Sequence, residues 1–587
     1  MESRAPIMNP PTSAFRAFLD ADWSAWLDLY PELGTVFGTP GYNDRWTDDS
    51  TAGIARRREQ LEKSLSTVRT FRREELAPED RTNYDLYRGL LEDAVEGLAF
   101  GEEPNPFHFG MPHNLWMPIS QMEGIHLAIA DMVVMQPRQR TRDLEDIVAR
   151  LRAAPAAIDN NIALLEAGLR RGYSAPQAAI HGVPAQVHGL IPEDPMKSPL
   201  LDAFQERPAA VSEADWARVV ADARQAYAEG VRPALRRLHA YLKDTYLPAC
   251  RPTVGISGVP HGASHYEHLI RWQTTTQLTA KEIHEIGLAE LDRIHREMEK
   301  VRAAAGFSGS LAEFYTYLRT DPKFFYGEAA ALVDKYRALG KRADAGLARL
   351  FGRLPRLPYG VEPMPAFKAA SSPAAYYMPG APSDGRPGIF YANTHNLGTR
   401  PMWEMEDLVL HEAVPGHHLQ IALSEELGNL PAFRRHSGFT AFVEGWGLYA
   451  ETLGEELGFY QDPLSKMGQL IADAWRSVRL VVDTGIHALG WSREKAIQFF
   501  AENAGRSMAD ITVEIDRYIV WPGQALGYKI GQLKFRELRT RAEKALGEKF
   551  DVRAFHDIVL GEGGLPLRMV EDRVDAWVRA GGPRVTA

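Results

Sequence analysis

The chain has 587 residues but only one cysteine, Cys250. A single cysteine cannot form an intramolecular disulfide framework, and it cannot supply the several thiolates of a cysteine-rich zinc site. We therefore expect Cys250 to be a partly buried, inert thiol rather than a nucleophile.

Long apolar runs and basic clusters are also missing. No run of 18 apolar residues occurs, and the apolar stretch 125–134 is short and contains Asp131. The N-terminal stretch has no unbroken apolar core, so it does not resemble a signal peptide. Lys and Arg number 67 against 77 Asp and Glu, a net charge of −10 with no basic cluster. We expect a cytoplasmic protein that binds neither nucleic acid nor membranes, and a homodimer is left open.

The sequence pattern predicts a mainly α-helical fold. Hydrophobic residues make up 45% of the chain, enough to bury a sizeable core. Thr279 with Glu282, and Ser310 with Glu313, match the capping box that starts many helices. Further helical patterns cover residues 226–246, 327–352 and 491–587.

Two regions interrupt the helical pattern. Residues 357–396 form the only convincing β-containing stretch, in which "GIFYANT" predicts a short strand. A segment rich in Gly, Pro and Ser begins after residue 246 and marks a soft boundary. We therefore expect an N-terminal helical part, 1–250, and a catalytic helical part with one small sheet, 251–587, packed as one continuous unit.

The stretch "LHEAVPGHH" is similar to a metal-binding helix with unusual spacing. Two histidines four residues apart on a helix can meet one ion, but His417 comes six residues after His411, about 9 Å along the axis and about 120° away. His418 lies on nearly the same face as His411 but about 10.5 Å along the axis. Pro415 and Gly416 disfavour a straight helix, and a bulge that absorbs two residues can bring His417 into place. We favour His417 as the second ligand and keep His418 as the alternative.

Two carboxylates complete this predicted site. Glu412 follows His411 directly, where a general base that activates water is expected. Glu444 falls in a later helical segment among apolar residues, where an unpaired carboxylate would be costly. A catalytic zinc takes three such ligands and keeps one open position, so we predict one Zn²⁺ held by His411, His417 and Glu444. Manganese or cobalt would accept the same ligands. The alternative is that these histidines are capping or surface residues.

Several segments together carry a family resemblance: "TTTQLTAKEIHEIGLAELDRI", "YYMPGAPSDGRPGIFYANT", "LHEAVPGHHLQIAL", "FVEGWGLYAE", "RLVVDTGIHALGWSREKAIQFF" and "WPGQALGYKIGQLKFRELR". With them the chain resembles the bacterial domain-of-unknown-function family 885 over roughly residues 272–539. That family is similar to thermostable carboxypeptidases and, more distantly, to neurolysin-type oligopeptidases, which are gluzincins. The resemblance implies a large helical zinc peptidase with a central groove; the spacing in "HEAVPGH" departs from ordinary zinc peptidases.

A charged stripe is predicted on one later helix. Arg479, Asp483 and His487 follow at four-residue intervals and so share a helix face. We expect Asp483 to orient His487, His487 to act on the reaction intermediate, and Arg479 to bind substrate. A structural ion pair is the alternative. Arg476 and Lys529 are further candidates to meet a substrate carboxylate.

A tyrosine is the expected donor to the oxyanion, because a phenol remains a donor at neutral pH. The resemblance implies a tyrosine near the metal, and we favour Tyr528 over Tyr518; a core tyrosine is the alternative. Asn393 and Thr394 end the predicted strand, where they could bind an extended peptide. A purely structural edge strand is the alternative for these two side chains.

Together these features predict a zinc-dependent hydrolase that cleaves peptide bonds of short peptides. The resemblance alone indicates a carboxypeptidase or oligopeptidase, because no motif identifies the substrate. Three alternatives are an amidase that acts on a non-peptide metabolite, a catalytically inactive metal- or peptide-binding protein, and a helical scaffold without metal.

Overall fold

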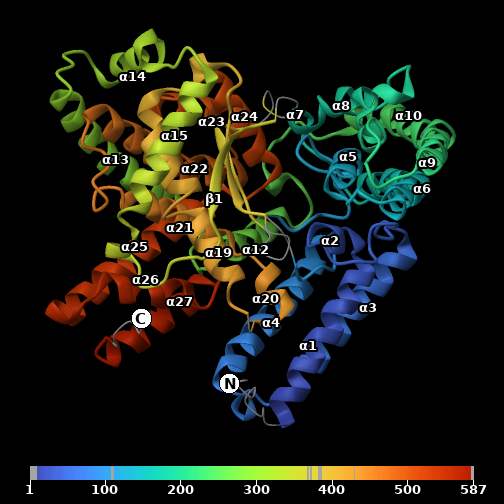
Figure 1. Ribbon diagram of the computed structural model, residues 1–587, viewed down its shortest axis with the longest axis horizontal. Helices are drawn as coiled ribbons and strands as arrows, with labels where there is room; N and C mark the ends of the chain where they lie inside the picture. Colours follow the sequence, from blue (N-terminus) through green and yellow to red (C-terminus); the bar gives the residue numbers. More distant parts are fainter. Residues whose placement is uncertain are drawn as a thin grey trace. The chain divides into compact units, whose positions relative to one another are not determined.

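The computed structural model describes residues 10–107, 111–365, 369, 373–380, 386–428 and 430–582. The chain forms two compact units, the first made of residues 1–265 and 431–436 and the second of residues 266–430 and 437–587. Helices dominate both units (Figure 1), which confirms the mainly α prediction.

The first unit contains twelve α-helices among its described residues. They are α1 (Pro10–Leu29), α2 (Pro31–Val36), α3 (Thr51–Val68), α4 (Pro78–Gly97), α5 (Ile125–Met135), α6 (Thr141–Arg170), α7 (Gln177–Ile180), α8 (Val183–Gly189), α9 (Glu213–Ala226), α10 (Arg232–Tyr241), α11 (Leu247–Ala249) and α20 (Ala432–His436). Cys250 is buried in this unit, and burial raises the pKa of its thiol to about 12, as expected for an inert thiol.

Helix α12 (Gly262–Thr274) begins in the first unit and continues into the second. The other described helices of the second unit are α13 (Ala280–Ala304), α14 (Leu311–Thr320), α15 (Ala329–Asp344), α16 (Leu347–Leu350), α18 (Met405–Glu412), α19 (His417–Glu425), α21 (Thr440–Thr452), α22 (Pro463–His487), α23 (Arg493–Asn503), α24 (Met508–Val520), α25 (Leu526–Leu546), α26 (Val552–Leu560) and α27 (Leu567–Arg579). Of the helices described in the two units, none is long and apolar enough to cross a membrane.

Both predicted capping boxes start helices. Thr279 accepts a hydrogen bond from the Glu282 backbone N–H at 3.2 Å, and the Glu282 carboxylate accepts one from the Thr279 N–H at 2.8 Å. Ser310 and Glu313 form the same pair of bonds at the start of α14. These bonds satisfy backbone donors that have no partner inside the helix.

The predicted small sheet lies in the second unit. It has three strands, β1 (Tyr359–Pro363), β2 (Ala375–Met378) and β3 (Gly388–Ala392), in the order β1-β3-β2. β3 pairs parallel with β1 and antiparallel with β2, and its residue Phe390 faces Val361 on one side and Tyr377 on the other. Helix α15 packs against β1, as Figure 1 shows, and α18 packs against β2. The sheet is therefore fixed beside the helix that carries His411.

Two pairs of helices cross closely in the second unit. A side chain at Gly445 of α21 would approach the Gly531 Cα to 2.5 Å, and one at Gly531 of α25 would approach the Ala441 carbonyl oxygen to 1.9 Å. Only glycine at both positions allows α21 and α25 this contact. A Cβ on Gly287 of α13 would lie 2.7 Å from the Cγ2 atom of Val481 on α22, so these two helices also cross closely. Helix α22 is buried along most of its length. Helices α21 and α22 are therefore closely packed against their neighbours.

Candidate metal centre

The helix that carries His411 ends within the unusual spacing. Helix α18 stops at Glu412 and α19 starts at His417, so the chain leaves the helix for four residues. We had predicted instead a bulge within one continuous helix. Pro415 has no amide hydrogen to donate. A Cβ on Gly416 would lie 1.8 Å from the His411 carbonyl oxygen, so no other residue fits there. The result is a tight reversal that turns His417 back toward His411.

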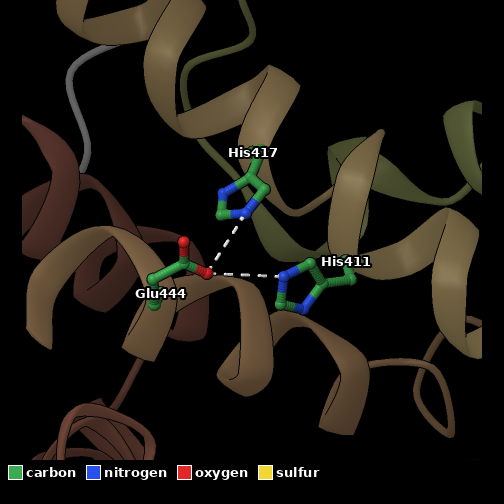
Figure 2. A group of neighbouring side chains, drawn as sticks. All are labelled: His411, His417 and Glu444. Carbon is green, nitrogen blue, oxygen red and sulfur yellow. Dashed lines mark ion pairs between the residues drawn. The ribbon is translucent and has the colours of Figure 1, made fainter. Parts of the chain in front are cut away.

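Three predicted ligands converge at this break. The Glu444 Oε2 atom lies 3.6 Å from His411 Nε2 and 3.5 Å from His417 Nε2. Figure 2 shows the three side chains pointing toward one another, with Glu444 supplied by α21. One ligand atom from each residue lies within 4.8 Å of the other two, and both histidines are buried. This cluster could hold a metal ion.

The spacing of these atoms can be compared with what zinc requires. Atoms bound about 2.1 Å from a tetrahedral ion lie about 3.4 Å apart. The two distances from Glu444 match this value closely. Two histidines and one carboxylate leave the fourth position open, which is the composition of several catalytic zinc sites. The chemistry of the three ligands and the two distances from Glu444 therefore fit a zinc ion.

The electrostatics of the cluster favour a positive charge. Burial alone would lower the pKa of His411, but hydrogen bonds to Glu444 and Glu451 outweigh burial and raise this pKa well above its usual value. Burial would likewise raise the pKa of Glu444, yet the charges of His417 and His411 hold it well below its usual value. A cation can take the place of the protons that these groups share.

His418, the alternative second ligand, faces elsewhere. Its Nδ1 lies 2.9 Å from the Tyr377 hydroxyl, and its Nε2 lies 3.1 Å from the Leu357 carbonyl oxygen. Since a carbonyl only accepts, Nε2 carries the proton and Nδ1 accepts from the tyrosine. Burial lowers the pKa of His418 to about 4, so the ring stays neutral. His418 ties α19 to the sheet, and His417 alone reaches the cluster.

Helix α21 supplies more than one contact to His411. Glu444, Gly447 and Glu451 lie on one face of this helix. A Cβ on Gly447 would come 2.8 Å from the His411 ring, so the ring packs directly on the helix backbone. His411 Nδ1 donates to Glu451 Oε1 at 2.7 Å, which directs Nε2 toward Glu444. Glu451 was not among our predicted residues, although its seven-residue spacing from Glu444 was visible in the sequence.

Glu451 is itself held by buried groups. Arg476 Nη2 lies 3.5 Å from its Oε1, and the hydroxyl of Tyr460 donates to its backbone carbonyl at 3.1 Å. Asp407, one turn before His411, is a close neighbour; burial and the Glu451 charge raise the pKa of Asp407 well above its usual value. Glu451 Oε1, rather than Asp407, is the acceptor for His411 Nδ1.

Replacing Glu451 with glutamine is expected to weaken zinc binding by about 10- to 100-fold, because the histidine loses the partner that orients it. Competition with a chromophoric chelator measures this affinity. Glu455→Gln is a suitable control, since Glu455 is 63% exposed and pairs only with Lys466 among the described residues. An unchanged affinity in Glu451→Gln would show that this carboxylate does not position the ligand.

Glu412 lies between the metal cluster and the sheet. Its Oε2 accepts a hydrogen bond from the Tyr377 backbone N–H of β2 at 3.0 Å. Burial raises the pKa of Glu412, and the neighbouring charges of His417 and His411 offset part of that rise. The sheet therefore holds in place the carboxylate that we predict to be the general base.

Tyr528, the predicted oxyanion donor, is buried near the start of α25. Its ring lies under the Arg479 guanidinium at 4.3 Å, and its hydroxyl accepts from Arg517 at 3.2 Å. Tyr518 accepts a bond from Arg479 Nε at 2.9 Å and donates to Glu514 at 2.5 Å. The Tyr518 hydroxyl already donates its proton to Glu514, so it has no second proton to donate to an oxyanion.

His487 and Asp483 are placed differently from our prediction. Neither belongs to the metal cluster. Asp483 accepts from the Tyr266 hydroxyl at 2.5 Å and from the Gly523 backbone N–H at 3.0 Å, rather than holding His487. His487 is fully buried and donates to the Tyr518 carbonyl at 2.9 Å. It lies about 16 Å along α22 from Arg476, the residue of this helix that contacts Glu451.

The predicted peptide-binding residues after β3 differ from each other. Asn393 is fully buried, and its amide donates to the carbonyl oxygens of Ala369 and Pro373 and accepts from the His395 N–H. These bonds indicate a structural role for Asn393. Thr394 is half-buried, and its contact with substrate stays a prediction. Lys529 is fully buried and paired with Asp473 and Glu290, so it cannot meet a substrate carboxylate.

Comparisons with known proteins place the chain in a family. Residues 31–574 match the model of a bacterial protein family of unknown function, DUF885, so the chain belongs to that family. Among curated proteins, none matches. A crystal structure from Colwellia psychrerythraea, provisionally described as a lipoprotein, is similar at 26% identity and a TM-score of 0.90, covering 97% of this chain and 99% of that one.

Two further solved structures are more distant. One from Shewanella oneidensis, provisionally described as a lipoprotein of unknown function, shares 17% identity with a TM-score of 0.74 and covers 95% of this chain and 99% of its own. Another from Bacillus anthracis, provisionally described as an oligoendopeptidase F, has 11% identity and a TM-score of 0.29 over 89% of this chain and 96% of its own. That score is too low to support an argument. The cytoplasmic location stays a prediction.

Proposed function

We propose that this member of the DUF885 family is a zinc-dependent hydrolase that cleaves peptide bonds in short peptides. The observation that carries the proposal is the convergence of His411, His417 and Glu444 at zinc-ligand distances, with Glu412 next in the chain to one ligand. A purely structural or storage site has no need of a carboxylate in the position of Glu412.

Zinc in such a site polarises a substrate carbonyl and lowers the pKa of water at the open position. The chain's own residues supply the remaining steps. Glu412 accepts a proton from the attacking water and passes it to the nitrogen of the leaving amine. Because burial raises the pKa of Glu412, it is a stronger base than a solvent-exposed glutamate.

Tyr528 is the proposed donor to the developing oxyanion. Its hydroxyl oxygen accepts from Arg517, so its own proton is available to a substrate oxygen. The Arg479 guanidinium over its ring adds a positive charge nearby. Removal of an oxyanion donor of this kind typically costs about 10²–10³ in kcat.

The test is cleavage of defined substrates by protein loaded with zinc. We expect at least some short peptides to be cleaved, as measured by mass spectrometry, with activity lost to 1,10-phenanthroline and restored by added zinc. Non-peptide amides in the same panel address the amidase alternative: cleavage of those alone would replace the peptidase assignment. If zinc-loaded protein cleaves neither class, the proposal is wrong.

A further inference from the structure

The two histidines of the metal centre are held in different ways. His411 Nδ1 donates to Glu451 at 2.7 Å, so a carboxylate orients its ring. His417 Nδ1 is buried and has no hydrogen-bond partner among the described residues. A histidine that binds a metal is usually oriented by a bond from its other ring nitrogen. Because His417 lacks such a bond, its position depends on the backbone that carries it.

That backbone is the break between α18 and α19. Residues 413–416 of the break are buried and lie outside both helices. The His418 N–H donates to the Ala413 carbonyl oxygen across the break at 3.1 Å. The carbonyl oxygen of Pro415, two residues before His417, accepts a bond from the indole N–H of Trp446 at 2.9 Å. The Trp446 side chain therefore ties the break to α21.

The Trp446 ring is held from several sides. The side chain is fully buried. Its ring centre lies 5.8 Å from that of Phe535 on α25, 5.6 Å from that of His556 on α26, and 6.2 Å from that of Phe351. The first two contacts are edge-to-face, at 82° and 90°, an arrangement that aromatic rings favour. These contacts fix the direction of the indole N–H toward Pro415.

Helix α21 thus makes contacts on both sides of the break. On the side of His411, Glu451 of α21 accepts from the histidine ring. On the side of His417, Trp446 of α21 holds the backbone. The same helix carries the third ligand, Glu444. All three ligands are therefore positioned by contacts or by residues of α21.

Loss of the indole N–H would remove the donor from the Pro415 carbonyl. Pro415 is buried, and a buried acceptor without a partner is unfavourable. A shift of the break can relieve this cost. Only Gly416 separates Pro415 from His417, so such a shift moves the His417 backbone, and no bond from His417 Nδ1 to a described residue opposes the movement.

We propose that Trp446 is a positioning residue of the metal centre: its indole N–H, bonded to the Pro415 carbonyl, sets the position of His417 relative to Glu444. This inference rests on the metal centre of the proposed function. It does not depend on which bond the enzyme cleaves.

The experiment measures metal binding and needs no activity. Trp446→Phe keeps an aromatic ring but removes the N–H. We expect the zinc affinity, measured by competition with a chromophoric chelator, to fall by about 10- to 100-fold, the range for groups that orient metal ligands. Cobalt accepts the same ligands, and its visible absorption reports the coordination geometry, so the spectrum of the cobalt-loaded variant should also change.

Trp403→Phe is the matched control. Trp403 is 4% exposed, and its indole N–H also donates to a backbone carbonyl, that of Leu318, at 3.1 Å. Neither Trp403 nor Leu318 belongs to the metal cluster. This variant loses the same group, so its thermal melt should change comparably, whereas its zinc affinity and cobalt spectrum should match those of the wild type.

A second variant serves if Trp446→Phe does not fold. Trp446→benzothienylalanine replaces the indole N–H with sulfur and keeps the shape of the ring, so it removes the donor without creating a cavity. We expect the same loss of zinc affinity as in Trp446→Phe.

The outcomes separate this inference from the proposed function. Wild-type zinc affinity and cobalt spectrum in a folded Trp446 variant would overturn the positioning role. An equal loss of zinc affinity in Trp403→Phe would overturn it too, because general destabilisation would explain the effect. Weaker zinc binding in the Trp446 variants alone, without peptide cleavage by the zinc-loaded wild type, would support the positioning role and overturn the hydrolase. A wild type that takes up no zinc would overturn both.

Discussion

Glu412→Gln is expected to lower kcat for peptide cleavage by about 10²–10⁴-fold while zinc stays bound. The amide of glutamine has nearly the shape of the carboxylate and can still accept the Tyr377 N–H, so the local fold should survive. It cannot accept a proton from water. KM should change little, because the substrate contacts proposed above do not involve Glu412.

Two measurements on this variant make the result interpretable. Zinc content shows that the ligands are intact, and steady-state kinetics with one peptide gives kcat. Glu425→Gln, an exposed position at the end of α19, is the matched control and should retain wild-type activity. Full activity in zinc-loaded Glu412→Gln would show that Glu412 is not the general base.

The grouping of His411, His417 and Glu444 could be predicted because it depends on local features of the chain. Pro415 and Gly416 cannot continue a helix between two histidines, so the sequence itself shows that the chain turns there. Glu444 stood out because a lone carboxylate among apolar residues needs a partner. What could not be foreseen was the form of the turn: the crowding of Gly416 against the His411 carbonyl ends α18 rather than bulging it.

The small sheet was also predictable, since "GIFYANT" has the β-branched and aromatic residues of a strand. Its pairing was not, because β3 lies between two strands that precede it in the sequence. The pairing matters for the site, as it brings the Tyr377 N–H of β2 to Glu412. That contact depends on tertiary packing that no local pattern encodes.

The stripe on α22 shows a different limit. Arg479, Asp483 and His487 were predicted from helical spacing, and they do lie on one helix. A shared face does not specify what packs against it. The Tyr266 hydroxyl donates to Asp483, and His487 donates to the Tyr518 carbonyl; neither residue belongs to the metal cluster. Conversely, Glu451 was missed because its role depends on the packing of α21 against α18, which brings its carboxylate to His411.

Loss of zinc from ligand variants is the second large effect expected. Each of His411→Ala, His417→Ala and Glu444→Ala removes one of three protein ligands, and two ligands hold zinc far more weakly than three. We expect bound zinc to fall from about one ion per chain to near zero after dialysis against buffer. Activity should fall with it.

His418→Gln is the matched control for these variants. His418 is adjacent to His417 and equally part of the histidine-rich stretch, but its ring bonds to Tyr377 and Leu357 rather than to the cluster. Glutamine can keep part of that bonding. This variant should retain its zinc, and thermal melts of all four variants separate loss of the metal from loss of the fold.

The most direct measurement is the zinc content of the purified wild-type protein by mass spectrometry of the element, beside these four variants. About one zinc per chain in the wild type and in His418→Gln, with none in His411→Ala, His417→Ala and Glu444→Ala, is the predicted result. A wild type that takes up no zinc after incubation with the ion, or ligand variants that retain it, would contradict the metal centre and the function proposed from it.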